Sequence, residues 1–207
     1  MAAEAFALQG NHVRLEPLTR AHADGLAAAA GTDDVLYQWT WVPRTRAEAE
    51  RYIDTAVSGR DAGTAIPFAT INPATGAVIG STRFWNLEKW AWPEGHPEAG
   101  RHLCDVCEIG HTWLAPTFIR TAANTEAKFL MLQHAFETWR VHRVSFHTDA
   151  RNQRSRAAIE RIGGQLEGVL RAQRMGADFT VRNSARFSII AEEWPAARAS
   201  LLRRLNR

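Results

Sequence analysis

The stretch from Glu108 to Lys128 reads EIGHTWLAPTFIRTAANTEAK and decides the fold expected for the chain. Its first part belongs to a mostly apolar run from Val106 to Leu114 that is typical of a buried strand. Pro116 interrupts that run, and a helix is expected to begin near Asn124 or Thr125. The stretch therefore predicts a strand, a turn and a helix in succession, which is the building unit of an α/β domain.

The turn itself has the properties of an anion site. Such a turn presents unpaired backbone N–H groups together with the positive end of the helix dipole, and a pyrophosphate suits both. Arg120 adds a positive charge at this point of the sequence. Side-chain hydrogen bonds are available from Thr121, Asn124 and Thr125.

The segments that follow continue the alternation of helix and strand. The helix is expected to run to about Arg140, because its apolar residues are spaced three and four apart. Arg143 to Thr148 then reads as a strand, and Asn152 as the cap of a short helix that ends at Gly163-Gly164. The apolar face of the longer helix consists of Phe129, Leu132, Phe136 and Trp139.

The remaining elements complete one continuous sheet. Further strands are expected at 12–16, 65–71, 77–85, 165–173 and 181–190, and helices at 18–29, 45–57 and from Trp194 onward. The Thr45–Glu48 pair is a capping box at the start of the second of these helices. We expect an α/β fold with a mixed sheet of about seven strands flanked by helices, as a single domain over residues 1–207.

Bulk composition excludes several classes of protein. The 207 residues are 45% hydrophobic and 23% charged, as in a globular protein, and no apolar run approaches the roughly 18 residues of a membrane span. The N-terminus does not read as a secretion signal, so a cytoplasmic location without membrane association is expected. Arginines gather in the C-terminal half, but the formal charge is only +3, which makes a solvated face a better interpretation than nucleic-acid binding.

The cysteines and tryptophans fall into distinct groups along the chain. Cys104 and Cys107 form one CxxC without the second half of a zinc site, so reduced thiols are expected and no metal. Of the eight tryptophans, Trp113, Trp139 and Trp194 lie in periodic segments that suit the core. The others are candidates for a substrate wall, and the Trp90–Gly100 loop is a candidate flap over a site.

The residues quoted above, taken jointly, resemble the acetyl-CoA loop of the GCN5-related N-acetyltransferase (GNAT) superfamily, in its RimJ/RimL-like branch. The resemblance covers almost the whole chain. It continues through His134-Ala135-Phe136-Glu137, Asn152-x-x-Ser155, Leu166-Glu167-Gly168 and Glu193-Trp194-Pro195. It implies the GNAT fold and an enzyme that transfers an acetyl group from acetyl-CoA to an amine.

The resemblance also implies a cofactor site. The strands ending at Leu114 and beginning near Arg143 are expected to splay apart, with the pantetheine arm along Trp113 and Leu114. The diphosphate would lie on the turn, and arginines would favour the phosphorylated end of coenzyme A. The family has glycine where this chain has Ala122, a departure expected to cost about 1 kcal/mol if the site needs a positive φ. Residues implied in cofactor binding are Trp113, Leu114, Arg120, Thr121, Ala122, Ala123, Asn124, Thr125, Asn152 and Arg156.

Catalytic roles follow in the same way. A carboxylate is the usual base for the acceptor amine, and Glu108 is the first candidate, with His111 and Asp149 as alternatives. RimL-like members have a glutamate base beyond the Leu166-Glu167-Gly168 motif, but Arg174 stands there. The acid that many relatives supply as tyrosine is Ile159 here, so the resemblance transfers that role to Ser155.

The acceptor stays open at this level. It could be a protein N-terminus, an amino acid or another small-molecule amine, and its pocket is expected to include Trp39, Trp85, His111 and Asp149. Homodimers are common among relatives and are expected here by analogy. The alternative hypothesis is a GNAT-fold acyl-CoA-binding or regulatory protein that has lost turnover, which the Ala122 departure motivates.

Overall fold

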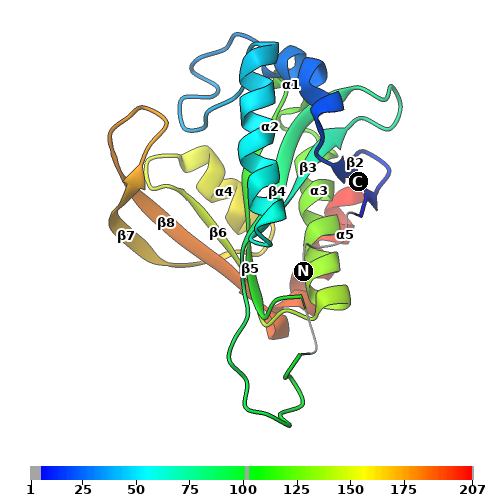
Figure 1. Ribbon diagram of the computed structural model, residues 1–207, viewed down its shortest axis with the longest axis vertical. Helices are drawn as coiled ribbons and strands as arrows, with labels where there is room; N and C mark the ends of the chain where they lie inside the picture. Colours follow the sequence, from blue (N-terminus) through cyan, green and yellow to red (C-terminus); the bar gives the residue numbers. More distant parts are fainter. Residues whose placement is uncertain (1–5, 101–102, 207) are drawn as a thin grey trace.

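A single mixed sheet forms the centre of the computed structural model, which describes residues 6–100 and 103–206 (Figure 1). Within those ranges the strand order is β1-β2-β3-β4-β5-β6-β8-β7, and neighbouring strands are antiparallel except β5 and β6. The eight strands are β1 (Leu8–Gln9), β2 (Arg14–Pro17), β3 (Ala65–Ile71), β4 (Val78–Glu88), β5 (Val106–Leu114), β6 (Arg143–Asp149), β7 (Gln165–Met175) and β8 (Val181–Ile190). This confirms the expected mixed α/β sheet, with eight strands where about seven were expected.

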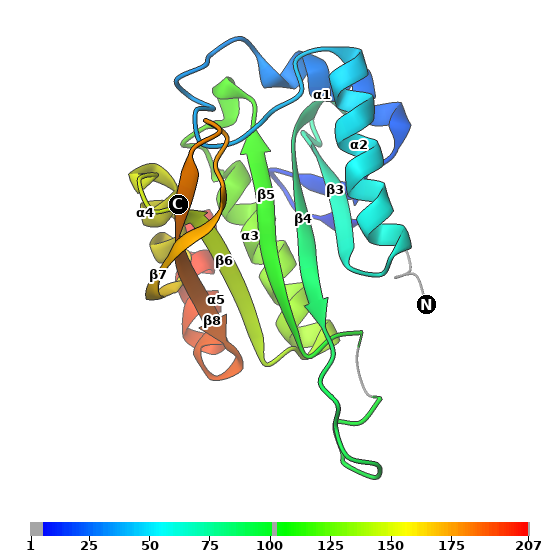
Figure 2. The same cartoon turned by 60° about the vertical axis from the view of Figure 1, so that its left-hand side comes forward.

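Helices cover both faces of the sheet (Figures 1 and 2). On one face α1 and α2 bury Leu26 and Ile53 against β3 and β5, in a cluster that includes Ile71 and Trp113. On the other face α3 and α5 bury Leu132 and other apolar residues against the sheet. The helices are α1 (Ala23–Ala30), α2 (Arg46–Asp61), α3 (Ala122–Gln133), α4 (Gln153–Arg161) and α5 (Trp194–Leu205). Short 3-10 turns at Arg20–His22, Pro116–Phe118 and Ala191–Glu193 precede α1, α3 and α5, respectively.

The sequence patterns explain most of these elements. The Thr45–Glu48 capping box opens α2, with Thr45 Oγ1 accepting from the Glu48 amide at 3.2 Å. The apolar face predicted for α3 and its extension is buried, and so are Trp113, Trp139 and Trp194. No helix in the described ranges is both long and apolar enough to cross a bilayer.

Two expectations about α3 need correction. The helix begins at Ala122 rather than near Asn124 or Thr125, because Thr121 adopts an extended backbone and its hydroxyl caps the Ala123 amide. The helix also changes at its other end, where His134–Trp139 continues as a π-helix. The π turn ends at Arg140, which has a left-handed backbone with φ 57°.

The Trp90–Gly100 loop is not a flap over the pocket described below. It connects the end of β4 to the start of β5 and projects from the lower end of the sheet in Figures 1 and 2, whereas the pocket opens where β5 ends. Its tryptophans serve the loop itself. Trp92 Nε1 donates to Asp105 Oδ1 at 2.7 Å, and the Trp90 ring stacks on His142 with centroids 5.3 Å apart.

The CxxC pair lies in the core. Cys104 and Cys107 are buried and not joined by a disulfide. A hydrogen bond that the Cys107 thiol donates to Cys104, together with burial, raises the pKa of Cys107. A thiol in this state is a poor nucleophile, so the pair acts as part of the packing.

Candidate active site

The site begins where the two parallel strands separate. β5 and β6 pair only from Val106↔Arg143 to Glu108↔Ser145, although β5 continues to Leu114 and β6 to Asp149. Because the strands diverge beyond Glu108, a pocket of about 320 Å³ opens between them. The splay that the sequence resemblance implied is therefore present.

A bulge in β5 shapes the floor of this opening. Arg83 pairs with Gly110 and Ser81 with Trp113, so β5 holds one more residue than β4 over the same span. His111 takes up the extra residue, with a left-handed backbone at φ 51°. As a result Thr112 points to the α3 side of the sheet, where its hydroxyl meets Lys128, while Trp113 packs on the α1 and α2 side.

The N-terminus of α3 forms one end of the pocket. Thr121 Oγ1 accepts from the Ala123 amide at 3.2 Å, whereas the amides of Ala122 and Asn124 have no protein acceptor among the described residues. Arg120 carries the left-handed backbone, with φ 63°. Ala122 is helical, so its methyl group causes none of the backbone strain that the sequence suggested.

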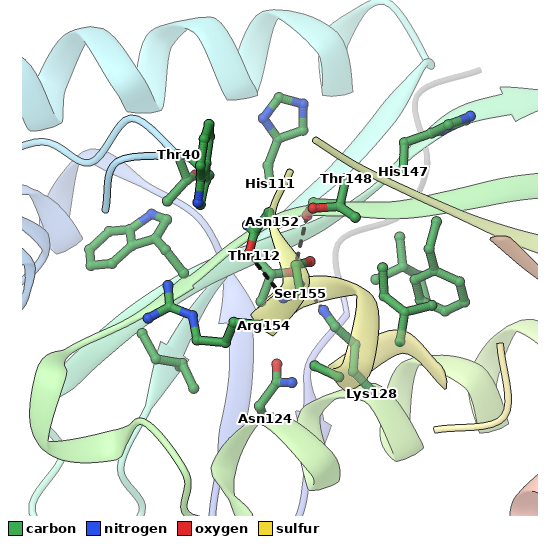
Figure 3. A pocket seen from close by; sticks show the side chains of 18 of the residues that line it. Thr40, His111, Thr112, Asn124, Lys128, His147, Thr148, Asn152, Arg154 and Ser155 are labelled. Carbon is green, nitrogen blue, oxygen red and sulfur yellow. Dashed lines mark hydrogen bonds between the residues drawn. The ribbon is translucent and has the colours of Figure 1, made fainter. Parts of the chain in front are cut away.

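The first turn of α4 forms the facing wall (Figure 3). Asn152 Oδ1 accepts from the Ser155 amide at 3.0 Å, which makes Asn152 the helix cap. The Ser155 side chain lines the pocket, and Arg154 lines it too while donating to the Leu36 carbonyl at 2.7 Å. Arg156 does not line the pocket, since it turns toward the Ala150 carbonyl, to which Nη1 donates at 3.3 Å.

Lys128 is a functional candidate that the sequence did not single out. Its side chain is buried, with Nζ donating to Thr82 Oγ1 at 3.0 Å and to Thr112 Oγ1 at 2.6 Å. Burial lowers the pKa of this ammonium to about 7. Lys128 ties α3 to the bulge of β5 at the base of the pocket.

A carboxylate and an imidazole meet at the point where the strands separate. Glu108 is 3% exposed, and its Oε2 accepts from Asn86 Nδ2 at 3.2 Å. The Nδ1 atom of His147 lies 2.8 Å from the same oxygen. Both Glu108 and His147 line the pocket, and within its described lining Glu108 is the only carboxylate.

Aromatic rings surround the carboxylate. Trp85 packs edge-on against His111 with centroids 4.9 Å apart, and Trp39 lines the pocket under the guanidinium of Arg151. Solvent reaches part of the His111 ring. Its partial burial, followed by the positive charges of three arginines, nevertheless lowers the pKa of His111 to about 3, so the ring is neutral at physiological pH. These arginines are Arg83, Arg174 and Arg182.

Asp149 is not part of the pocket, contrary to the expectation from sequence. Both its carboxylate oxygens accept from Arg151, at 3.0 Å and 2.8 Å, and this partner lowers the pKa of Asp149. Asp149 is thereby unsuited to the alternative role of base. Ala123 also lies away from the pocket, since it is buried in the core beneath α3, and Ala122 does not line the pocket.

The pocket thus has two sides. In Figure 3, Asn124 and Lys128 lie with α3, whereas His111 and His147 extend toward α2. The α3 side offers open amides and cations, and the opposite side a carboxylate among rings. Predicted residues that the structure brings together in the pocket are Trp39, Trp85, Glu108, His111, Trp113, Leu114, Arg120, Thr121, Asn124, Thr125, Asn152 and Ser155.

A family model matches most of the chain, including both splayed strands and the turn before α3. The model of the acetyltransferase (GNAT) domain matches residues 12–165. The chain belongs to the GNAT acetyltransferase family. It is accordingly an acyltransferase, and the family uses acetyl-CoA.

Solved structures agree with this assignment. A GCN5-related N-acetyltransferase from Brucella melitensis is 30% identical with a TM-score of 0.83, over 99% of this chain and 87% of that one. RimJ from Mycobacterium smegmatis in complex with CoA-disulfide shares the fold at 20% identity, with a TM-score of 0.76 over 97% of this chain and 93% of that one. No curated protein matches the chain.

Sequence reasoning missed several residues that line the pocket, and the reasons differ. Tyr37 comes from the segment before α2, where it is buried and its hydroxyl donates to the Leu114 carbonyl at 2.8 Å. Its place next to Trp39 could have drawn attention to it. Lys128, His147 and Arg182 carry no such signal, because their roles depend on contacts across strands.

Proposed function

We propose that this single domain is an N-acetyltransferase that moves the acetyl group of acetyl-CoA directly to a primary amine. The observation that supports it best is the continuity of the opening between β5 and β6. That opening joins the open amides at the start of α3 to the buried carboxylate of Glu108. One end suits a diphosphate, and the other suits an amine that must lose a proton.

The residues present fit coenzyme A. The Asn124 amide, the Arg120 and Arg154 side chains and the dipole of α3 would hold the diphosphate. Within the described residues β6 does not pair with β5 beyond Glu108, so this edge of β5 can accept the pantetheine arm as an added strand before Leu114, whose carbonyl is taken by Tyr37. When bound, acetyl-CoA supplies the thioester carbonyl carbon that the amine attacks.

Glu108 is the proposed base. A protonated amine entering from the side of Trp85 and His111 meets one carboxylate, and Glu108 can take its proton there directly or through water. Asn86 donates to this carboxylate, and the His147 ring lies beside it without a hydrogen bond. His111 is a weaker candidate because its lowered pKa makes the imidazole a poor proton acceptor.

Ser155 is the proposed acid for the departing thiolate. Its amide is held by Asn152, and its hydroxyl lines the pocket on the first turn of α4. The dipole at the start of this helix also favours a developing negative charge. Ile159, where relatives have tyrosine, is 8% exposed and cannot donate a proton.

Release of free thiol from acetyl-CoA, followed with a panel of peptides, amino acids and small amines, tests the proposal. We expect Glu108→Gln to lower kcat by roughly 100-fold or more and Ser155→Ala by about tenfold, with coenzyme A affinity unchanged. Glu160→Gln is the matched control, since it makes the same change on an exposed residue of α4 outside the pocket. Full rates in both active-site variants would refute the assigned roles.

Binding of coenzyme A is measured separately, by calorimetry. Arg120→Gln should weaken it about tenfold, because one charge-assisted contact is lost. If acetyl-CoA does not bind to the unmodified protein, the transferase itself is refuted. That outcome would leave no support for the acyl-CoA-binding alternative either.

The RimJ/RimL-like branch, and with it a protein N-terminus as acceptor, is supported by the sequence motifs. A free amino acid or another small amine suits the partly enclosed pocket equally well.

The expected homodimer is supported by apolar side chains on β7 and β8, where Met175 is 65% exposed and Val181 74%, and its test is light scattering in solution. The cytoplasmic location stays a prediction.

A further inference from the structure

Two arginines face each other across the β7–β8 hairpin at the edge of the pocket. Arg174 and Arg182 are direct partners in the strand register, and both line the pocket. Like charges placed opposite each other in an antiparallel pair are destabilising. Repulsion between these two side chains therefore lowers the stability of the fold, and the packing of the hairpin does not explain why both positions are arginine.

The register that brings them together is itself irregular. Leu170 pairs with Ser184 and Arg174 with Arg182, so β7 advances four residues between these two pairs while β8 advances two. Ala172 takes a left-handed backbone within this bulge, with φ 49°. Bulges of this kind commonly redirect side chains at the rim of a site.

Neither guanidinium forms an ion pair with a described carboxylate, although Asp149 and Glu108 act on Arg182 from a greater distance. In the described part of the chain no ion pair joins Arg174 or Arg182 to a carboxylate, and Nε of Arg182 is buried without a hydrogen-bond partner. Arg174 donates to Gln173 and lies over the Trp85 ring, 5.0 Å from its centroid. Arg174 thus lies over the tryptophan that flanks the amine side of the pocket, and Arg182 lies opposite Arg174 on β8.

A third arginine adds to the same field. Arg83 is 7% exposed on β4, stacks on Tyr52 and has a buried Nε without a partner in the described residues. Its register partner is Gly110, next to His111, which feels the charge of all three arginines. Arg83 does not line the pocket, so it contributes to the positive potential around His111 without contacting the contents of the pocket.

The nearby acids are already engaged. Glu108 has His147 and Asn86 as partners, and Asp149 is held by Arg151 through both oxygens. An amine with no other charge would therefore enter a region of net positive potential, which is unfavourable for an ammonium. An acceptor that also carries a negatively charged group would bind favourably on this side of the pocket.

We infer that the acceptor carries an oxyanion, a carboxylate or a phosphate, close to the amine, and that Arg174 and Arg182 bind it. Guanidinium groups suit this task, because their planar forks match the oxygens of both groups. The amine end then lies toward Glu108 and the anionic end toward the hairpin. This inference rests on the proposed function and names the class of its acceptor.

Matched acceptors test the inference by steady-state kinetics. Amino acids are compared with their amides, O-phosphoethanolamine with ethanolamine, and peptides beginning with Asp with peptides beginning with Asn. We expect the anionic member of at least one pair to have a kcat/KM at least tenfold higher, and the pair concerned identifies the source of the oxyanion. Arg174→Gln and Arg182→Gln should each abolish that preference without changing KM for acetyl-CoA.

Arg171→Gln is the matched control, because Arg171 is exposed on the same strand and does not line the pocket. It should keep the preference. The inference is wrong if kcat/KM for the neutral acceptor equals that for the anionic one in every pair. It is also wrong if the preference for the anionic acceptor persists in both Arg174→Gln and Arg182→Gln.

A binding arm separates this failure from failure of the proposed function. The protein is first saturated with coenzyme A, so that the phosphate-binding turn is occupied, and the anionic acceptors are then titrated by calorimetry. Binding that is lost in Arg174→Gln supports the inference even where no transfer is seen. Absence of binding by every carboxylate and phosphate of the panel overturns it, whether or not acetyl-CoA binds.

Discussion

The Nδ1 atom of His147 lies 2.8 Å from Oε2 of Glu108, and the two residues come from strands that have just parted. Their strands still pair at Glu108↔Ser145, so His147 is two residues beyond the last paired position. The contact thus spans the gap at its narrow end. Although Nδ1 makes no hydrogen bond in this geometry, the ring limits the space into which the Glu108 carboxylate, the proposed base, can turn.

Removing the imidazole should weaken catalysis without weakening cofactor binding. We expect His147→Ala to lower kcat about tenfold, because an unsupported carboxylate samples unproductive orientations. His147→Gln should recover part of the loss, since its amide can donate to Glu108. KM for acetyl-CoA should stay unchanged in both variants, and a change in that KM alone would contradict a positioning role.

His111 reports the charge around the acceptor. Burial and then Arg83, Arg174 and Arg182 lower its pKa to about 3. In an Arg174→Gln/Arg182→Gln double variant the pKa of His111 should rise, while remaining below 6.5 because burial and Arg83 persist. Titration of the ring by NMR measures this, and Arg171→Gln should leave the value unchanged. An unaltered pKa in the double variant would show that the two arginines do not face the ring.

The fold could be predicted largely because its signals are local. β3, β5 and β8 begin and end within a residue of where alternation and turn residues place them. α3 begins two to three residues before the expected start near Asn124 or Thr125, since Thr121 supplies the cap. Alternation alone does not predict Leu8–Gln9 as a strand, because this two-residue strand pairs only with β2; the family resemblance does place it in the opening strand.

The site was less predictable, because register and burial decide it. The spacing in NTEAK suggests a polar helix face, yet Glu126 and Lys128 are both buried. Glu126 accepts from the amides of Asn11 and Val13, at 2.9 Å and 2.8 Å, so its partners lie more than a hundred residues away. Arg174 and Arg182 meet only through a bulge, which alternation cannot reveal.

Gly80 should tolerate no side chain. It has φ +154°, and a Cβ there would lie 2.1 Å from the Trp113 carbonyl oxygen, which is backbone that cannot yield. We expect Gly80→Ala to lower the free energy of unfolding by about 3 kcal/mol or more in urea denaturation. Gly76→Ala is the control: its φ is +71° but no atom lies within 4 Å, so the cost should be only about 1 kcal/mol. Equal costs would contradict the steric argument.

Lys128 should make the stability of the protein depend on pH in the alkaline range. Its pKa in the folded state is about 7 against 10.5 as the ordinary value, so between these pH values the unfolded chain binds a proton that the folded chain does not. Stability contributed by this group therefore rises as pH increases from 7 to 10.5, by at most about 1.4 kcal/mol per pH unit. Below pH 7 the buried ammonium is charged in both states, and its full cost is present.

The comparison with Lys128→Met isolates this effect. Methionine has a similar length and no charge, so the variant should lose the alkaline gain while keeping the dependence due to other groups. The free energy of unfolding in urea, measured for both proteins from pH 6 to 10, gives the difference directly. We expect the variant to be relatively more stable at pH 6 and the advantage to shrink toward pH 10. Parallel curves would mean that Lys128 keeps its proton in the folded state, with the Thr82 and Thr112 hydroxyls sufficient to hold a charged ammonium beneath the bulge.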